Sequence, residues 1–496
     1  MGLKHKTIAG FIWTFSGTVG SGVISFMVTM ILARALTPSD FGILELMIVF
    51  TSLSTVIVDS GFTQAIIRDN NASLIDLSTV FFFNIIVSVI IYLVLFFCAP
   101  IIANFFKTQE LIYLTRFLFL SIILDSFAII QNANLNRNLN FRPFAIASVS
   151  AIIIAGIVAV IMAFSGWGVW SLAWNIVLIS GIRTLMLWIQ SNWRPKLHFS
   201  LTSLKKYFVF GINLLFQGLI DKIVTNLESF LIGRFYTKQS LGYFSQARRF
   251  DAYISQTTTN VVQKVTYPSL SKLKDEPERL KNGYRRVIGL TMFCITPLMI
   301  FTMFTAENFI SVIFGPKWIP SAEYLRVWAI WGFIFPISTI STNIFLVKGK
   351  SKLLLKLSLV KQLLRIIAVT SLISIGIIQM LYAIVFCGTV TTLLYMFFGG
   401  KLIDYKIREM LNDIKMSFSS TIISTICVWA ITLTIPRTTN LYISFFIQIT
   451  TMLFSYLILS KYFFKSIYSK EGIEIASSLI LKIIPSNAHR HTKMYK

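Results

Sequence analysis

Long apolar runs separated by short polar segments recur along almost the whole chain. Most runs are about twenty residues long, the length that an α-helix needs to cross the hydrocarbon core of a bilayer. The pattern predicts an all-α polytopic membrane protein with about fourteen transmembrane helices, and it leaves no stretch for a separate soluble domain. We place the helices at 8–32, 42–63, 77–103, 111–131, 143–164, 168–190, 207–233, 241–263, 287–310, 322–346, 354–375, 378–399, 417–435 and 441–460.

An internal repeat divides these helices into two sets. Ile31-Leu-Ala-Arg-Ala-Leu-Thr-Pro-Ser-Asp-Phe-Gly42 follows the first apolar run, and Leu231-Ile-Gly-Arg-Phe-Tyr-Thr-Lys-Gln-Ser-Leu-Gly242 follows the seventh. The two copies share Arg34/Arg234, Thr37/Thr237 and Gly42/Gly242. An even number of helices in each set makes both sets cross the membrane in the same direction, as parallel repeats.

The repeat predicts two parallel six-helix lobes followed by a terminal helix pair. The cleft between the lobes is then the natural place for a site. The predicted domains are an N-terminal lobe at 1–190, a cytoplasmic linker at 191–206, a C-terminal lobe at 207–400, and a terminal helix pair with a cytoplasmic tail at 401–496.

The charge distribution predicts the orientation of the chain in the membrane. The net charge is +25, yet only 13% of the residues are charged and 55% are apolar. With both termini in the cytoplasm, 30 of the 45 Lys and Arg residues fall in cytoplasmic segments, nine in helices and six in outer loops. This is the positive-inside pattern of a multi-pass protein, which also favours contacts with anionic membrane lipids over binding of nucleic acid.

Little in the sequence favours catalysis or a cofactor. The four cysteines lie inside apolar runs, and the four histidines lie in terminal segments or a hydrophilic loop. Neither set has the spacing of metal ligands or of a proton relay. The outer loops are short. We expect no cofactor, no metal site and no enzymatic activity.

Polar and charged residues are concentrated in the seventh and eighth predicted helices. A single Arg or Asp at the middle of a bilayer costs about 2.5–3.5 kcal/mol, so these faces are not expected to contact lipid. One interpretation is a water-filled cavity, and the other is a set of buried ion pairs that fasten the two helices together. One face of the seventh helix carries Asn213, Gln217, Asp221, Thr225 and Glu228, with Lys222 on its flank; the eighth carries Gln246, Arg249, Tyr253, Gln256, Asn260 and Gln263, with Arg248 and Asp251 on its other faces.

Further charges lie in other predicted helices. Arg365 belongs to the eleventh helix, well inside the membrane. Arg183 lies near a helix end, where its long side chain is expected to reach the membrane surface. Asp59 and Asp125, near the inner ends of their helices, are candidate partners for the basic loops.

Several short motifs occur in one order over about 290 residues. They are Leu32-Ala-Arg-Ala-Leu-Thr-Pro-Ser-Asp-Phe-Gly42, Asp59-Ser-Gly-Phe-Thr-Gln-Ala65, Arg137-Asn-Leu-Asn-Phe-Arg142, Ile232-Gly-Arg234, Leu241-Gly-Tyr-Phe-Ser-Gln-Ala-Arg-Arg249, Tyr267-Pro-Ser-Leu-Ser-Lys-Leu273 and Phe314-Gly-Pro-Lys-Trp318. In these residues the chain resembles the polysaccharide exporters of the MOP superfamily, the Wzx-type flippases, and among them the colanic-acid-exporter-like branch.

The resemblance implies a V-shaped pair of lobes around a cationic cavity that opens alternately to the two sides of the membrane. Helices 1, 2, 7 and 8 would line the cavity. The implied substrate is an undecaprenyl-diphosphate-linked oligosaccharide, an O-antigen, capsule or exopolysaccharide unit, and the implied location is the bacterial cytoplasmic (inner) membrane. Membrane lipids and, as a further candidate, polysaccharide polymerase machinery are the expected partners.

Arginine and lysine are the side chains expected to bind the diphosphate, because Arg offers a planar fork for phosphate oxygens and Lys a point charge. The acidic residues among them offset much of this charge, so they are assigned either to ion coupling or to ion pairs. The substrate-binding candidates are Arg249, Arg248, Arg365, Lys222, Gln217, Gln246, Tyr253, Gln256 and Asn260, and the acidic candidates are Asp221, Glu228 and Asp251.

Two alternative functions remain open at this stage. A multidrug or cation antiporter of the same superfamily would have the same architecture. A membrane glycosyltransferase or polysaccharide polymerase would be expected to carry a sizeable outer loop with catalytic carboxylates or arginines, and no such loop is visible in the sequence.

Overall fold

The computed structural model describes residues 3–69, 71–137, 140–434, 436 and 440–463. Within these residues the regular structure is helical and contains no β-strand, which agrees with the predicted all-α class. Among the described residues, eleven helices are long and apolar enough to cross a membrane, or twelve if the two arms of a bent helix at 201–235 count as one span. The remaining predicted segments, around 241–263 and 354–375, are also helical but more polar. The count of fourteen crossings stays a prediction.

The helices form two compact units. The first comprises the described parts of 1–253, 313–324 and 362–384, and the second those of 254–312, 325–361 and 385–463. This division follows proximity, whereas the predicted lobes follow the internal repeat, so the predicted domain boundaries stay predictions. The predicted tail beyond residue 463 lies outside the described residues.

Ten helices belong wholly to the first unit. They are α1 (Leu3–Ala35), α2 (Pro38–Asp59), α3 (Phe62–Arg68), α4 (Leu74–Phe105), α5 (Leu111–Leu118), α6 (Leu120–Arg137), α7 (Arg142–Phe164), α8 (Val169–Gln190), α9 (Leu201–Phe235) and α10 (Lys238–Asp251), and the short 3₁₀ turn η2 (Pro316–Trp318) joins them.

The remaining helices lie in the second unit or contribute residues to both. Those wholly in the second are α11 (Thr257–Ser271), α12 (Pro277–Phe304), α17 (Ile407–Thr434), α18 (Leu441–Ile458) and the π-helical turn η3 (Leu459–Phe463). Those with residues in both are the π-helical turn η1 (Ala252–Gln256), α13 (Ala306–Ile313), α14 (Ser321–Val347), α15 (Ser351–Leu372) and α16 (Ile377–Lys401).

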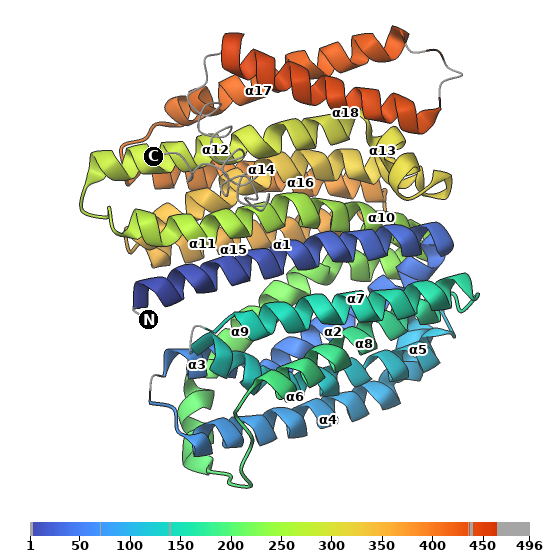
Figure 1. Cartoon of the computed structure of the whole chain (residues 1–496), viewed down its shortest axis with the longest axis vertical. Helices are drawn as coiled ribbons and strands as arrows, with labels where there is room; N and C mark the ends of the chain where they lie inside the picture. The colour runs from blue at the N-terminus through green and yellow to red at the C-terminus, as the bar shows by residue number, and fades with distance from the viewer. Residues whose placement is uncertain (1–2, 70, 138–139, 435, 437–439, 464–496) are drawn as a thin grey trace, which may run out of the picture. The chain divides into compact units, whose positions relative to one another are not determined.

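Small residues allow close helix packing in the first unit. α1 lies beside α7, and α7 beside α8 (Figure 1). A Cβ added at Gly17 would lie 2.7 Å from the Cβ of Ala145, and one added at Gly156 would lie 2.5 Å from a methyl group of Val28. Glycine at these two positions therefore permits the short distance between α1 and α7.

The segment before α9, predicted as a cytoplasmic linker, is held against the start of α4. The backbone N–H groups of Lys196 and Ser200 donate to the hydroxyl groups of Ser78 and Thr79, at 3.0 and 3.1 Å. The Lys206 ammonium and the Tyr207 hydroxyl then both donate to the Asp69 carboxylate, at 2.5 and 2.8 Å. These hydrogen bonds stabilise the charged carboxylate and lower the pKa of Asp69 to about 2. The linker is thus an ordered part of the first unit.

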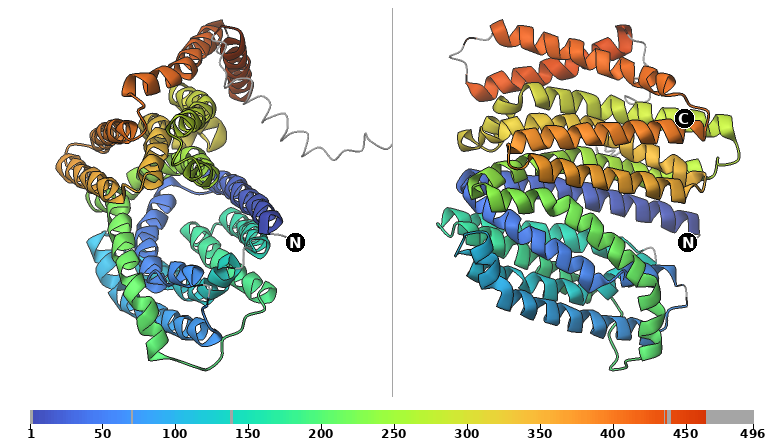
Figure 2. Two further views of the ribbon diagram at one scale, coloured as in Figure 1. Left: turned by 90° about the vertical axis from the view of Figure 1, so that its left-hand side faces the viewer. Right: turned by 180° about the vertical axis from the view of Figure 1, so that it is seen from behind.

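The second unit has an apolar core between α12, α14, α16 and α17. Charged side chains border this core at the start of α17. There the guanidinium of Arg285 donates two hydrogen bonds of 2.7 Å to the Asp413 carboxylate. α17 and α18, the orange and red pair in Figure 2, lie side by side. The Tyr456 hydroxyl donates to the backbone oxygen of Phe293 on α12, at 2.8 Å. The last two predicted helices therefore pack as neighbours within this unit.

Candidate functional site

The two copies of the repeat begin two helices that cross each other. Thr37 and Thr237 act as N-caps of α2 and α10, and each side chain accepts a hydrogen bond from the backbone N–H three residues later. At the crossing, a Cβ added at Gly42 would lie 1.9 Å from the backbone oxygen of Lys238. One added at Gly242 would lie 1.8 Å from the backbone oxygen of Pro38. The shared glycines therefore mark a reciprocal contact between the two copies, which brings α10 against α2.

This contact places a buried carboxylate beside two candidate arginines. Glu45 lies on α2, one turn after Gly42, and is 2% exposed. Its Oε1 accepts from the Arg248 Nη2 at 2.5 Å, and its Oε2 accepts from the Arg249 Nη2 at 3.4 Å. The hydroxyl of Ser229 on α9 also donates to Oε1, at 3.0 Å. One glutamate thus serves both guanidinium groups.

Both arginine side chains are further positioned by aromatic rings and remain partly accessible. The guanidinium carbon of Arg248 lies 5.5 Å from the ring centre of Phe244, and that of Arg249 lies 5.9 Å from the ring centre of Phe41. The arginine side chains are 19% and 24% exposed, respectively. Each arginine therefore binds the buried Glu45 while its side chain as a whole stays partly exposed.

Glu45 was absent from the residues proposed from the sequence. The ion-pair interpretation grouped the arginines with Asp221, Glu228 and Asp251, but in the described ion pairs both arginines bind Glu45 on α2. The signal was present in the sequence as a single glutamate within the apolar run Gly42-Ile-Leu-Glu-Leu-Met47. A lone charge in such a run is costly unless it is paired, and this cost could have identified it.

A second buried carboxylate on α9 binds another candidate. Glu228 is 0% exposed, and its Oε1 accepts a hydrogen bond from the Nε of Arg365 on α15 at 2.8 Å and forms an ion pair with the Nη2 at 2.6 Å. About two helical turns before Glu228, on the same face of α9, the Asp221 Oδ1 accepts a hydrogen bond from the Nε2 of Gln362, at 3.2 Å. Arg365 and Gln362 belong to the part of α15 that lies in the first unit. Asp221 and Glu228, which the sequence predicted to share one face of α9, therefore both bind side chains of α15.

The side of α9 that carries Gln217, Asp221 and Lys222 is exposed in the first unit. A carboxylate and an ammonium group in direct contact with hydrocarbon would each cost several kcal/mol. This face is therefore expected to be hydrated, as the predicted water-filled cavity requires. No ion pair is recorded for Lys222 within the described residues, and its predicted role in binding stays a prediction.

The eighth predicted helix is not one continuous α-helix. The polar residues between 246 and 263 therefore do not share the one face that their spacing predicted. It consists of α10, the π-helical turn η1 and α11. A π-turn inserts one extra residue, which rotates the following side chains by about 100° relative to a continuous α-helix. The 246–263 pattern therefore does not continue as one straight face, and the chain passes from the first unit to the second within this turn.

On the first-unit side of this turn, three candidates are placed near its start. Gln246 and Asp251 are each 1% exposed. The Tyr253 hydroxyl lies 3.2 Å from the Ser25 hydroxyl on α1, and its ring meets Phe26 edge to face at 5.7 Å. Gln246 and Asp251 are too deeply buried in this conformation to contact a large ligand directly.

Beyond the turn, two candidates belong to the second unit. Gln256 is the last residue of η1 and is half-buried. Asn260 belongs to α11, and its side chain lies outside the described part of the structure. Their predicted contribution to binding stays a prediction.

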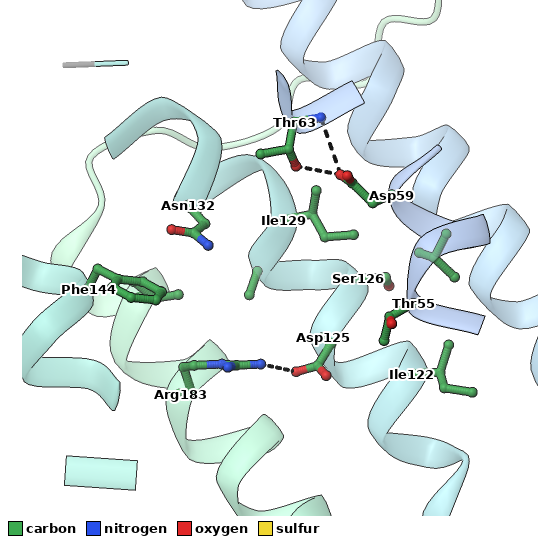
Figure 3. A pocket seen from close by; sticks show the side chains of 13 residues that line it. Thr55, Asp59, Thr63, Ile122, Asp125, Ser126, Ile129, Asn132, Phe144 and Arg183 are labelled. Atoms are coloured by element: carbon green, nitrogen blue, oxygen red, sulfur yellow. Dashed lines mark hydrogen bonds and ion pairs between the residues drawn. The ribbon is translucent and has the colours of Figure 1, made fainter. Parts of the chain in front are cut away.

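A polar pocket of about 260 Å³ lies elsewhere in the first unit, between α2, α3, α6, α7 and α8 (Figure 3). In it the Arg183 Nη2 donates to the Asp125 Oδ1 at 2.7 Å, so Arg183 binds a carboxylate of α6. Asp59 accepts hydrogen bonds from the hydroxyl and the backbone N–H of Thr63, at 2.5 and 3.2 Å. The two aspartates thus have partners within their own helix bundle, and the predicted pairing with basic loops is wrong for Asp125.

A bundle of membrane-spanning helices with charged groups paired in its interior defines a polytopic membrane protein of the transporter type. The chain belongs to the family described as polysaccharide biosynthesis protein, whose model matches residues 31–323. The match spans most of the motifs on which the sequence resemblance rests, and it confirms that resemblance.

Relatives and solved structures agree with the family. The teichuronic acid biosynthesis protein TuaB of Bacillus subtilis is 23% identical over 353 residues, which cover 71% of this chain and 73% of that protein. The lipopolysaccharide biosynthesis protein WzxC of Escherichia coli is 24% identical over 378 residues, or 74% of this chain and 75% of the other. The lipid II flippase MurJ, in an inward closed conformation, shares the fold with a TM-score of 0.72 at 17% identity, over 92% of this chain and 99% of the other.

The fold extends to a second group of transporters. An inward-facing multidrug resistance MATE family transporter of the MOP superfamily has a TM-score of 0.59 at 16% identity, over 77% of this chain and 94% of the other. Its TM-score and coverage are lower than those of the lipid II flippase, so the fold of this chain is more similar to the flippase than to this transporter.

Proposed function

We propose that the chain is a flippase that moves a polyprenyl-diphosphate-linked oligosaccharide across the bacterial cytoplasmic membrane by alternating access. The sugar head group crosses through a polar path within the protein, and the polyprenyl tail stays in the lipid. Family membership and relatives named for polysaccharide biosynthesis support this proposal. The shared fold of a lipid II flippase supports it further.

The observation that carries the proposal is the arginine pair on α10. Arg248 and Arg249 are adjacent in sequence, both bind one buried glutamate, and their side chains are partly exposed. Adjacent guanidinium groups match the several oxygens of a diphosphate, and such charge-assisted bonds are stronger than those between neutral groups. In this proposal Arg249 and Arg248 bind the diphosphate first, and Arg365 and Lys222 add positive charge. The candidates that contact sugar hydroxyls are Gln217, Tyr253, Gln256 and Asn260.

The orientation and the partners belong to the same proposal. Both termini lie in the cytoplasm, as the positive-inside distribution favours. An inside-negative membrane potential then favours outward movement of the anionic head group, by about 2.3 kcal/mol per charge per 100 mV. Polysaccharide polymerase machinery is the proposed partner on the outer side, because it would use the exported units.

A deletion strain provides the test. Loss of the gene is expected to remove a surface polysaccharide and to accumulate its lipid-linked unit, detected by mass spectrometry of extracted lipids. Expression of the unaltered chain restores the polysaccharide. Arg249→Ala is expected to restore it about ten- to a hundredfold less well, which corresponds to the loss of one charge-assisted hydrogen bond of about 1.5–3 kcal/mol.

Arg279→Ala is the matched control, because Arg279 is an exposed residue whose guanidinium pairs with Glu276 three residues earlier. It is expected to restore the polysaccharide fully. Membrane insertion of each variant is checked by blotting. Full restoration by an inserted Arg249→Ala protein would count against the site. A deletion strain that lost resistance to cationic drugs while keeping its surface polysaccharide would favour the multidrug antiporter instead.

A further inference from the structure

The positive charge of the binding arginines is partly offset by a residue of the protein itself. Arg248 and Arg249 together carry two positive charges, and Glu45 contacts both. Glu45 is 2% exposed, whereas the side chains of the two arginines are 19% and 24% exposed. Any anion that binds the arginines from the accessible side must share them with this carboxylate.

The charges near Glu45 come from a small number of elements. α10 contributes the two arginines and α9 contributes the Ser229 hydroxyl, which are its recorded partners in the described structure. Lys222, farther along α9, is exposed. A further carboxylate of α10, Asp251, is itself buried at 1% exposure. Several other charged groups on α2 and the helices packed against it have contacts of their own: Asp40 with Thr37, Asp59 with Thr63, Asp76 with Ser73, Arg116 with the backbone oxygen of Phe96, Asp125 with Arg183, Asp221 with Gln362 and Glu228 with Arg365.

The charge of the cluster does not match that of a diphosphate diester. With Glu45 ionised, the arginines and Glu45 carry a net charge of +1, whereas a diphosphate diester carries −2. Binding would leave two anions on one pair of arginines, and like charges at such short range disfavour each other. A proton on Glu45 removes the repulsion and leaves two guanidinium groups for two phosphate charges.

We propose that Glu45 is an exchangeable counter-anion, which offsets one of the two positive charges of the arginine pair in the empty transporter and takes up one proton when a diphosphate-linked substrate binds. The proton comes from a hydronium ion or buffer acid of the solvent: the donor loses its bond to hydrogen and leaves as its conjugate base, and a new O–H bond forms on a carboxylate oxygen of Glu45. The inference rests on the proposed function and adds to it a residue and a coupling between substrate binding and pH.

The internal repeat supports a specialised role for this cluster. With the offset of 200 positions between the two copies, Glu45 corresponds to Ser245, and the two arginines correspond to Ile48 and Val49. The acid therefore comes from one copy and both bases come from the other. A contact that served only to hold the two copies together would not need an acid from one copy and bases from the other. Gly42 and Gly242 already provide a contact between the two copies.

The experiment measures binding of undecaprenyl-diphosphate-N-acetylglucosamine to the full chain in nanodiscs between pH 8 and pH 6. A diester is chosen because a phosphate monoester would itself titrate near pH 6. If binding takes up one proton, the affinity is expected to rise by up to about tenfold for each unit that the pH falls. This holds over the pH range in which Glu45 is ionised in the empty protein and protonated in the substrate-bound protein. Titration calorimetry in buffers of different ionisation enthalpy is expected to show uptake of up to one proton.

The variants separate this role from a structural one. Glu45→Gln is expected to bind with an affinity that does not change with pH and that equals or exceeds the low-pH affinity of the unaltered protein. Glu45→Asp keeps a titrating carboxylate and is expected to keep a pH dependence. Asp125→Asn removes a different arginine-paired carboxylate of the same unit and is expected to behave as the unaltered protein.

Each negative result has its own meaning. If the unaltered protein binds the probe, and Arg249→Ala weakens binding, but no proton is taken up or Glu45→Gln keeps the pH dependence, the role of Glu45 is wrong and the proposed function stands. If the unaltered protein does not bind the probe at any pH, the proposed function fails and this inference fails with it. Because proton uptake is measured on the unaltered protein, the test does not depend on the stability of any variant.

Discussion

At the scale of single residues, the candidate site is organised by buried carboxylates that bind arginines. Glu45 and Glu228 are almost fully buried, while the arginine side chains that they bind are partly exposed. A buried carboxylate is stable in an apolar environment only with a charged partner. Each glutamate therefore fixes the position of an arginine and also reduces the positive charge that the arginine offers to a ligand.

The Glu228–Arg365 pair gives a prediction about stability. Arg365→Met leaves Glu228 buried without its cation, and we expect the free energy of unfolding to fall by about 3 kcal/mol. Glu228→Gln combined with Arg365→Met removes both charges and is expected to recover most of this loss. Thermal unfolding of the three proteins in detergent checks the prediction. A double variant no more stable than Arg365→Met alone would contradict the assignment of Glu228 as a charged partner.

At the scale of elements, the repeat explains how α2 and α10 come together. Each copy supplies a threonine cap, a first helical turn and a glycine, and the glycines meet the backbone of the opposite copy. The motif around Trp318 adds to the same region, because its indole N–H donates to the backbone oxygen of Ala33 at 2.8 Å and its ring meets Phe41 edge to face. Three motifs from distant parts of the sequence thus converge at one place.

The crossing predicts a difference between glycines. Gly42→Ala or Gly242→Ala places a Cβ within 2 Å of a backbone oxygen, which the helices relieve only by moving apart. We expect each change to lower the free energy of unfolding by about 1–3 kcal/mol, the usual cost of overpacking. Gly22→Ala is the control, since no atom lies within 4 Å of an added Cβ there, and alanine favours the helix. Melting temperatures measured in detergent compare the three, and equal values would argue against the close approach.

At the scale of the whole molecule, the orientation of the chain is the prediction that is most directly tested. Alkaline phosphatase fused after Trp167 is expected to be active, because this residue lies in a loop predicted to face outward. Green fluorescent protein fused after Asp275 is expected to fluoresce, because this residue lies in a predicted cytoplasmic loop. The opposite result at both positions would reverse the predicted topology and would show that the helix count before them is wrong.

The sequence predicted much of the fold because membrane insertion imposes a simple rule. Every backbone polar group in the hydrocarbon region must be bonded within its own segment, so an apolar run of about twenty residues indicates a helix. Fourteen predicted segments are helical in the described residues. The break at η1 was not predicted, because a π-turn depends on how the side chains around it pack and leaves the hydropathy pattern of 241–263 almost unchanged.

For the candidate site, the sequence by itself determined which helices carry charge, that the chain repeats and which family its motifs match. Those properties follow from composition and spacing along one helix. Only the tertiary structure decided the partners, placing Glu45 against Arg248 and Arg249, and Glu228 against Arg365. The physical reason is that an ion pair between helices depends on their crossing and rotation, which are set by packing contacts such as those of Gly42 and Gly242.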